Sequence, residues 1–224
     1  MKFFKEEANS LLNFQQGKVR LAVSQQLAAS VIPYLMTAFQ HEYPYIYTSL
    51  TDTPVEQVLK HVQNLDVDLG IGPERSGLID VESEELFTLG FHVVFPPSHR
   101  FAQYPNICWQ DLEEETLIVL SGEFSVILGA TLPSKIANRI LNAQYQVNFM
   151  STALSMVNSG LGITLCMPYV RRWVKQNNLL MQPIKEPVVM RQFNLYRRAK
   201  RPLSPAADAF CNFLKRDGII QTFF

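Results

Sequence analysis

Hydrophobic and polar positions alternate along the chain in a way that predicts strands and helices in turn. Segment 18–24 carries apolar residues at every second position, as a strand with one buried face does. Segment 25–41 repeats apolar residues at steps of four from Leu27 to Phe39, which predicts a helix that Pro33 either kinks or opens. Strands that alternate with helices are typical of a parallel sheet with helices on its faces, so the sequence predicts the α/β class.

The alternation forms two successive sets of strands and helices, which we call rounds. The first round adds a strand at 45–51, a helix begun by the capping box Thr53-Pro54-Val55-Glu56, and a strand at 67–72. A connection without periodicity then leads to the second round. Its predicted elements are strands at 86–95, 117–120, 145–149, 163–166 and 188–198, and helices at 134–141, from Ser151 as cap to Gly160, from Pro168 and from Ser204. Two such rounds with a return strand predict two lobes of similar construction.

Composition and charge exclude several classes of protein. Of the 224 residues, 47% are hydrophobic, and 20 basic residues balance 20 acidic ones. The apolar content excludes disorder, and the missing basic excess argues against a stand-alone nucleic-acid-binding protein. No apolar run reaches the roughly 18 residues that cross a bilayer, and the N-terminus lacks the features of a signal peptide. With three isolated cysteines as well, we expect a cytoplasmic protein with no membrane partner.

Patterns that carry catalysis or hold a metal are missing from the sequence. The four histidines have no ligand spacing, and neither a nucleophile elbow nor a P-loop occurs. The GxG triplets that begin at Gly70 and Gly160 lack a third glycine and are interpreted as tight turns and helix stops. Cys166 lies in an apolar strand and is expected to be a buried, inert thiol. The sequence therefore predicts no catalytic residue, metal site or cofactor, and the protein is not expected to be an enzyme.

Polar residues gather instead where the predicted strands end. In an open α/β sheet, ligands bind outside the carboxyl ends of the strands, where loops and helix starts converge. Four such loops are rich in hydroxyl and amide groups: 24–26 and 51–53 in the first round, and 121–125 and 150–152 in the second. Capping explains one polar residue per helix start, so four polar clusters at equivalent strand ends favour a ligand site.

Several segments, taken in order, resemble the effector-binding domain of LysR-type transcriptional regulators. The resemblance extends from Gly17 to Arg216. The segments that carry it are GKVRLAV at 17–23, Ile32-Pro33, the run from Phe39 to Pro44, DVDLGIG at 66–72, VVFP at 93–96 with SHRFA at 98–102, and MVNSGLGI at 156–163 followed by Met167-Pro168. Each motif is short, and the resemblance rests on their common order and spacing.

The resemblance implies two Rossmann-like lobes of the periplasmic-binding-protein type (type 2), joined by crossing strands, with a small effector in the cleft between them. Lobe I would comprise 17–85 and 185–224, and lobe II would comprise 86–184. Residues 1–16 look like the end of a linker helix. The family's N-terminal winged helix-turn-helix is not found in the sequence, so promoter DNA is expected to bind only through that missing module.

The resemblance also implies that the effector contacts come from the four strand-end loops. The implied effector-binding residues are Ser24, Gln25, Gln26, Thr51, Asp52, Thr53, Ser121, Gly122, Glu123, Phe124, Ser125, Met150, Ser151 and Thr152. Free N–H groups at helix starts favour a carboxylate. Because Asp52 and Glu123 fall in these loops while no Lys or Arg does, an amine-bearing effector stays open.

Regulation through assembly is a further implication of the resemblance. Effector binding would favour one angle between the lobes and so change the geometry of the oligomer. The expected assembly is a homodimer through the regulatory domains, with the helix near 31–39 facing a second-lobe helix of the partner, and a tetramer of the full-length protein. The alternative is a transporter's solute-binding protein with the same fold, against which the linker-like first helix and the missing signal peptide count.

Overall fold

A computed structural model describes residues 16–216, 218–220 and 222 of the chain. Of the predicted linker helix at 1–16, all but the last residue lie outside the described residues. The chain divides into two compact units, which we call unit 1 (up to Thr88, and again from Gln192) and unit 2 (Leu89–Arg191). The predicted limits, at 85/86 and 184/185, lie earlier in the chain than these.

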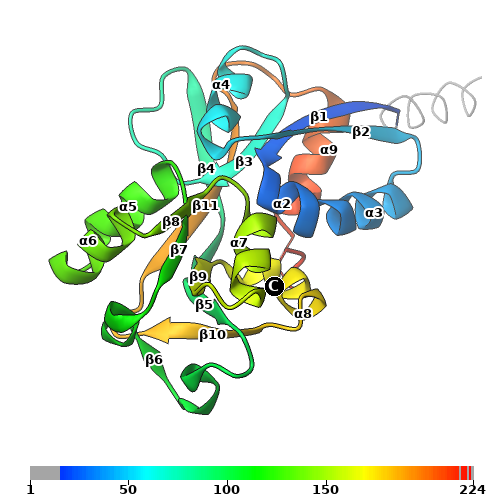
Figure 1. The fold of residues 1–224 in the computed structure, drawn as a ribbon. Helices are drawn as coiled ribbons and strands as arrows, with labels where there is room; N and C mark the ends of the chain where they lie inside the picture. The colour runs from blue at the N-terminus through cyan, green and yellow to red at the C-terminus, as the bar shows by residue number, and fades with distance from the viewer. Residues whose placement is uncertain (1–15, 217, 221, 223–224) are drawn as a thin grey trace, which may run out of the picture. The chain divides into compact units, whose positions relative to one another are not determined.

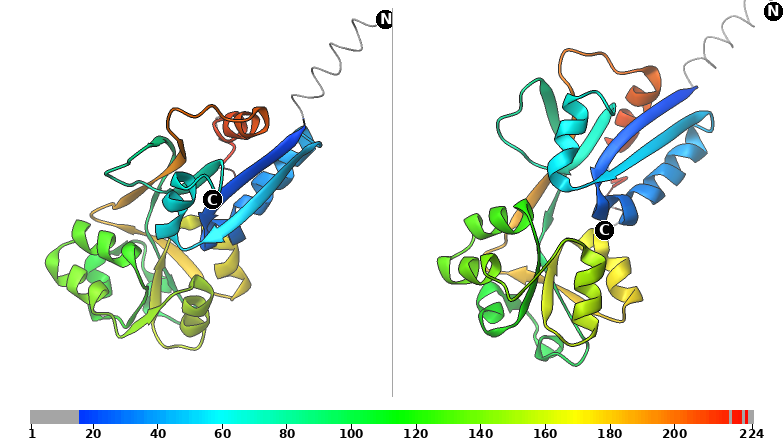
Figure 2. Two further views of the ribbon diagram at one scale, coloured as in Figure 1. Left: turned by 90° about the horizontal axis from the view of Figure 1, so that it is seen from above. Right: turned by 45° about the horizontal axis from the view of Figure 1, so that its top comes forward.

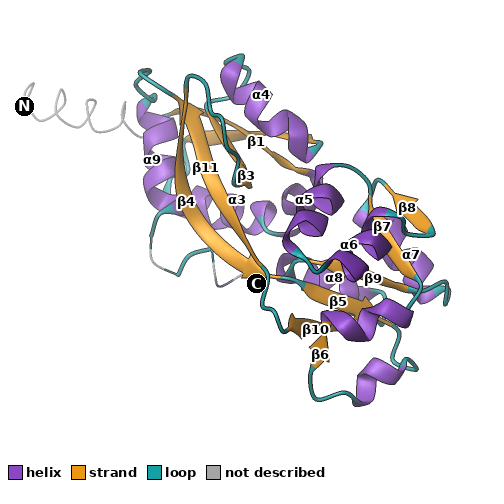
Figure 3. Ribbon diagram, turned by 90° about the vertical axis from the view of Figure 1, so that its left-hand side faces the viewer, coloured by secondary structure: helices purple, strands orange, loops and turns teal. Residues whose placement is uncertain are grey.

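Unit 1 holds a five-stranded sheet in the order β2-β1-β3-β11-β4 (Figure 1). Its elements are β1 (Gly17–Ser24), α2 (Gln25–Ser30), α3 (Ile32–Glu42), β2 (Ile46–Thr53), the 3₁₀-helix η1 (Val55–Gln57), α4 (Val58–Gln63), β3 (Leu69–Pro73), β4 (Val81–Gly90), β11 (Met190–Arg198) and α9 (Pro205–Leu214). Strand β1 pairs in parallel with β2 and β3, and β11 pairs antiparallel to β3. The long strands β4 and β11 are neighbours in this sheet (Figure 3), and each continues across a limit between the units.

Unit 2 holds a six-stranded sheet in the order β6-β10-β5-β9-β7-β8. Its elements are β5 (His92–Phe95), η2 (Arg100–Gln103), β6 (Ile107–Cys108), η3 (Trp109–Glu114), β7 (Leu117–Leu120), α5 (Glu123–Thr131), α6 (Ser134–Leu141), β8 (Tyr145–Val147), α7 (Met150–Asn158), β9 (Ile163–Cys166), η4 (Pro168–Val170), α8 (Arg171–Gln176) and β10 (Leu180–Lys185). Strand β7 pairs in parallel with β8 and β9, and β5 pairs antiparallel to β9.

The two units share one strand topology. In unit 1 the three parallel strands stand in the order second, first, third (β2-β1-β3), and in unit 2 the order is the same (β8-β7-β9). An antiparallel strand completes the set beside the third strand in both units, β11 in one and β5 in the other. The prediction of two rounds of similar construction is confirmed.

The core of unit 1 lies on both faces of its sheet. On one face, α4 packs on the strands through a cluster of Ala22, Val58, Val62, Val67, Val81 and Tyr196. Gly70 lies inside β3, where a Cβ atom would stand 2.8 Å from Cγ2 of Val62, so glycine here permits the close approach of α4. The interpretation of Gly70 as a turn residue is therefore wrong. Helix α3 contacts β2 and helix α9 contacts β1 (Figure 2).

Two predicted helix caps and one predicted loop are wrong. Thr53 is the last residue of β2, paired with Ser24 of β1, so it caps no helix; Pro54 precedes η1 and makes no side-chain cap bond. Ser151 lies inside α7, which begins at the buried Met150 after Phe149. The predicted loop 121–125 continues into α5, a nine-residue helix that was not predicted because its apolar residues form no clear stripe along one face.

The predicted boundaries of the two longest strands are also wrong. Segment 86–95 is interrupted at Phe91, which separates β4 from β5, and β4 begins at Val81 in the segment predicted to be a connection. Segment 188–198 forms β11 from Met190, and β10 before it was not predicted. The predicted helix 25–41 consists of two helices, α2 and α3, which are separated at Val31. Pro33 lies in the first turn of α3, in agreement with the prediction that it could open a helix.

Candidate functional site

In unit 1 the predicted residues meet at the carboxyl end of the parallel strands. Strand β1 ends at Ser24 and β2 ends at Thr53, and these two residues are direct partners in the parallel register. Two residues before this pair, Thr51 pairs with Ala22. Thr51 therefore lies on the same face of the sheet as Ser24 and Thr53. Ser24 is half-buried at the start of α2, and its hydroxyl makes no capping bond to that helix. It is therefore available for a ligand.

The other predicted residues of unit 1 are placed less favourably. Asp52 is exposed and pairs with Val23, so the alternation of the strand directs it to the opposite face from Thr51 and Thr53. Gln25 and Gln26 are half-buried in the first turn of α2, and the Gln26 carbonyl accepts a 2.6 Å hydrogen bond from the Ser30 hydroxyl. The negative charge of Asp52 would oppose a carboxylate effector, but Asp52 is thus directed away from the hydroxyl groups of Thr51 and Thr53.

Two residues that the sequence did not single out lie at the same end of this sheet. Asn194 of β11 is buried and pairs with Gly72 near the end of β3, and its side-chain oxygen accepts a 2.8 Å hydrogen bond from the Gln192 amide. Arg75 follows β3 by two residues and is half-buried. A polar Asn between the apolar residues Phe193 and Leu195 was the available sequence signal.

In unit 2 the corresponding loops also lie together. Strands β7 and β8 are parallel, with Leu120 paired to Val147, so both end at the same edge of the sheet. The Ser121 N–H donates to the Val147 carbonyl over 2.8 Å, which joins the loop after β7 to the end of β8. Gly122 precedes α5 with a φ of +92°, a conformation that favours glycine. The nine-residue helices α5 and α7 therefore both begin at this edge.

Among the predicted effector-binding side chains of unit 2, some are exposed and others are buried with structural roles. Ser121, Ser151 and Thr152 are exposed. Ser125 is buried, and its hydroxyl donates to the Leu120 carbonyl, so it holds the first turn of α5 against the end of β7. Met150 is buried in the core. The side chains of Glu123 and Phe124 lie outside what the structure describes.

The described residues contain no arrangement that resembles a metal centre or a reactive thiol. No group of three or more His, Cys, Asp or Glu side chains among them is placed to hold a metal ion. The three cysteines form no disulfide. Cys166 is buried, as predicted, and this burial raises the pKa of its thiol. In the described part of the chain, no helix combines the length and apolar character that a bilayer span requires.

Two α/β units of one strand topology, each with polar groups at the ends of its parallel strands, are typical of a class of ligand-binding domain. The family model described as "LysR substrate binding domain" matches residues 13–218. The chain therefore belongs to the LysR substrate-binding domain family, as the resemblance predicted.

Solved structures and curated relatives agree with this assignment. The effector-binding domain of QuiR in complex with shikimate aligns with a TM-score of 0.75 at 21% identity, covering 91% of this chain and 97% of that chain. HinK, a LysR family transcriptional regulator from Pseudomonas aeruginosa, aligns with a TM-score of 0.76 at 20% identity, covering 96% of this chain and 79% of that chain. At these identities the likeness shows the fold.

Two curated relatives are transcriptional regulators. The uncharacterized HTH-type regulator YfeR from Shigella flexneri is 29% identical over 205 residues, which cover 90% of this chain and 65% of YfeR. The dual regulator GltC from Bacillus subtilis is 24% identical over 213 residues, which cover 95% of this chain and 71% of GltC. The chain thus spans about two thirds of these proteins. Neither they nor the family model supports the transporter alternative.

Proposed function

We propose that this chain is the part of a LysR-type transcriptional regulator that senses a small-molecule effector, and that it is not an enzyme. The observation that carries the proposal is the row of polar side chains at the carboxyl end of the unit 1 sheet, where Ser24 and Thr53 are paired and Ser24 makes no capping bond. Ligands of open α/β sheets bind at such strand ends. The likeness to the shikimate-bound domain of QuiR supports the same kind of ligand.

The effector is a small carboxylate. Helices α5 and α7 begin at the strand ends of unit 2, and their free N–H groups favour an anion. Arg75 brings a positive charge to the strand end of unit 1, whereas the strand alternation directs Asp52 to the other face. These placements favour a carboxylate over the amine that the sequence left open.

In the full-length protein, the effector would act by shifting a population of conformations. A ligand changes such an equilibrium only by its different affinity for the two states, and couplings of about 1–3 kcal/mol are typical. We assign DNA binding to a separate module of the full-length protein, and the protein acts in the cytoplasm. The neutral charge of the chain, with 20 basic and 20 acidic residues, supports a sensing rather than a DNA-binding role.

Replacing Ser24 with alanine tests the effector site. We expect the affinity for a carboxylate found by thermal-shift screening of small carboxylates and amines to fall about 3- to 10-fold, because one hydrogen bond is lost. The melting temperature without ligand should stay unchanged, since the hydroxyl caps nothing. Titration calorimetry measures the change. The matched control is Ser49→Ala, a half-buried serine of β2 four residues before its end. Equal affinities of the two variants would remove Ser24 from the site.

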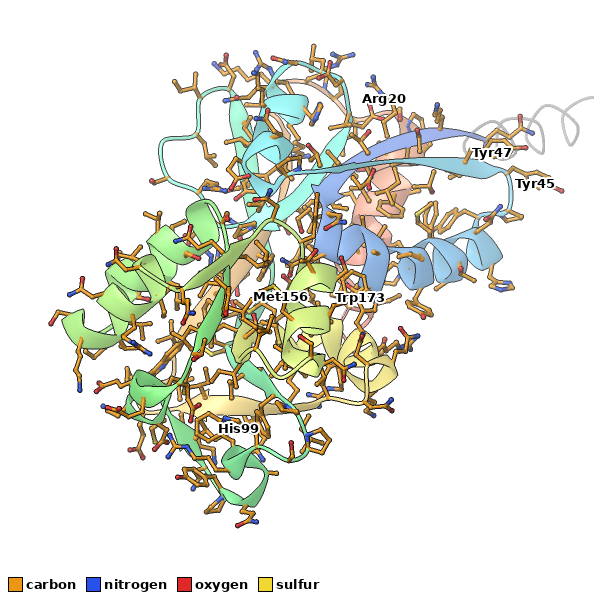
Figure 4. The ribbon with its side chains drawn as sticks, in the orientation of Figure 1. Arg20, Tyr45, Tyr47, His99, Met156 and Trp173 are labelled. Carbon is orange, nitrogen blue, oxygen red and sulfur yellow. The ribbon has the colours of Figure 1, made fainter. Side chains whose placement is uncertain are left out.

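The proposed homodimer has α3 facing a helix of unit 2 of the partner, with the edge strand β2 beside α3, and the full-length protein is proposed to be a tetramer. Strand β2 is the outer strand of its sheet. Tyr45, just before this strand, is 54% exposed, and Tyr47, its second residue, is 69% exposed (Figure 4). Exposed aromatic residues are enriched at protein interfaces. The exposed tyrosines support the inclusion of the edge strand β2 in the dimer surface.

Replacing Tyr47 with lysine is expected to weaken this dimer at least about tenfold, because a buried aromatic anchor becomes a charge. Light scattering coupled to size exclusion, over a range of concentrations, measures the dissociation constant. Ile79→Lys is the matched control, because Ile79 is 71% exposed in unit 1 on the loop before β4. A wild-type chain that stays monomeric, or equal weakening by both variants, would contradict this dimer surface.

A further inference from the structure

Unit 1 contains a cavity of about 270 Å³ at the other end of its sheet from Ser24 and Thr53. Arg20 of β1 and Asp68, which directly precedes β3, line it. Arg198, the last residue of β11, lines it too, together with Arg201 and Ser204 on the loop before α9. Because β11 runs antiparallel to β3, its end lies at the amino ends of the parallel strands. The cavity is therefore separate from the proposed effector residues.

Arg20 is a fixed part of the cavity wall (Figure 4). Its Nη2 lies 2.7 Å from Oδ1 of Asp68, and its Nη1 donates to the carbonyls of Leu65 and Asp66, each over 3.0 Å. Asp68 is occupied as well, since Oδ2 also accepts the Arg20 backbone N–H over 2.9 Å. The only carboxylate of the wall is thus saturated by donors of the protein.

The remaining polar groups of the wall are hydrogen-bond donors. Arg198 donates from Nη1 to the Gln63 carbonyl and from Nη2 to Asp80, each over 3.1 Å, which leaves its Nε–H outside these bonds. Arg201 is exposed and makes no hydrogen bond or ion pair with another described residue. The Ser204 oxygen accepts the Ala207 N–H over 3.2 Å, so its own O–H remains to donate.

We propose that this cavity binds a small phosphate monoester. Three guanidinium groups line it, of which Arg20 pairs with Asp68 and Arg198 pairs with Asp80, so among the described residues the positive charge of Arg201 remains unpaired. A phosphate monoester carries about −1.5 to −2 at neutral pH, and guanidinium groups match its oxygens. Apolar side chains, among them Leu203, complete the wall and suit a short carbon chain. The cavity lies just below the ~300–1,000 Å³ of typical ligand pockets, so the ligand is small.

Titration calorimetry of the whole chain with glycerol 3-phosphate and with inorganic phosphate tests the proposal. We expect one saturable site that binds glycerol 3-phosphate more tightly, because only the ester contacts the apolar wall. Arg201→Gln should weaken this binding at least about tenfold, because hydrogen bonds to charged groups are lost. The control is Arg171→Gln, which removes an exposed arginine from α8 in unit 2.

A second variant, Ser204→Asp, separates binding from folding. Ser204 caps α9, and aspartate is an equally good N-cap, so the melting temperature should not fall. The added negative charge should abolish glycerol 3-phosphate binding. The proposal is overturned if neither probe gives saturable binding, if Arg201→Gln and Arg171→Gln weaken it equally, or if Ser204→Asp still binds. Equal affinity for both probes would overturn the assignment to an ester.

Discussion

Replacing Gly162 with alanine is expected to lower the free energy of unfolding of unit 2 by about 2–5 kcal/mol. Gly162 has a φ of +156°, and a Cβ there would lie 2.3 Å from the Thr116 carbonyl oxygen. That oxygen cannot move away freely, because it accepts the Ile163 N–H over 2.9 Å where the pairing of β7 and β9 begins. The expected loss adds an overpacking cost of about 1–3 kcal/mol to a backbone cost of about 1–2 kcal/mol.

Gly160→Ala is the control, because it adds a Cβ at a positive φ without a steric clash. Gly160 has a φ of +83° at the end of α7, as the predicted helix stop requires, and a Cβ there would meet nothing within 4 Å. We expect a loss of about 1–2 kcal/mol for this variant. Urea denaturation followed by tryptophan fluorescence reports on unit 2, because Trp109 and Trp173 both belong to it (Figure 4 labels Trp173). Equal losses in the two variants would refute the steric argument at Thr116.

Replacing Phe39 with alanine is expected to destabilise unit 1 by about 3–5 kcal/mol, because a fully buried aromatic ring leaves a cavity. Phe39 lies on α3 with no exposed surface. Its ring centroid is 4.8 Å from that of Phe210 and 5.3 Å from that of Phe213, both edge to face, so α3 and α9 share one aromatic cluster. Aromatic pairs of this geometry add about 0.5–1.5 kcal/mol beyond the area that they bury.

Gln40→Ala is the control for Phe39, since Gln40 is the next residue of α3 and is exposed. Its effect should stay within about 0.5 kcal/mol. Urea denaturation followed by far-UV circular dichroism measures both units. A shift in circular dichroism without a shift in tryptophan fluorescence would show that unit 1 unfolds separately. If Phe39→Ala lost no more than Gln40→Ala, the aromatic cluster would not hold α3 to α9.

The elements that the sequence predicted best are those with a strong local pattern. Strands 117–120 and 163–166 and helix 134–141 have the predicted limits, because continuous apolar runs or a stripe after Pro133 define them without help from distant residues. Capping was predicted less well. At Ser204 a serine before a proline caps α9 as predicted, whereas Thr53 belongs to the pairing of β1 and β2. A local capping motif does not show whether the same residue pairs with a strand from another part of the chain.

The alternation of strands and helices followed from the sequence, and so did the expectation that polar loops gather at one edge of each sheet, because parallel strands separated by helices end at one edge. The face of each side chain did not follow. Only the extension of β2 to Thr53, where it still pairs with β1, directs Asp52 away from Thr51, and only packing buries Met150 and joins Ser125 to the Leu120 carbonyl.

Contacts between distant parts of the chain decided the rest. Asn194 reaches the strand end of unit 1 by pairing with Gly72, more than a hundred residues earlier. Arg20, Arg198 and Arg201 line one cavity although β1 and β11 lie near opposite ends of the sequence. A local pattern determines which segments become strands and helices, because it depends on neighbouring residues alone. Pairing and packing determine which polar groups meet, because they depend on residues far apart in the chain.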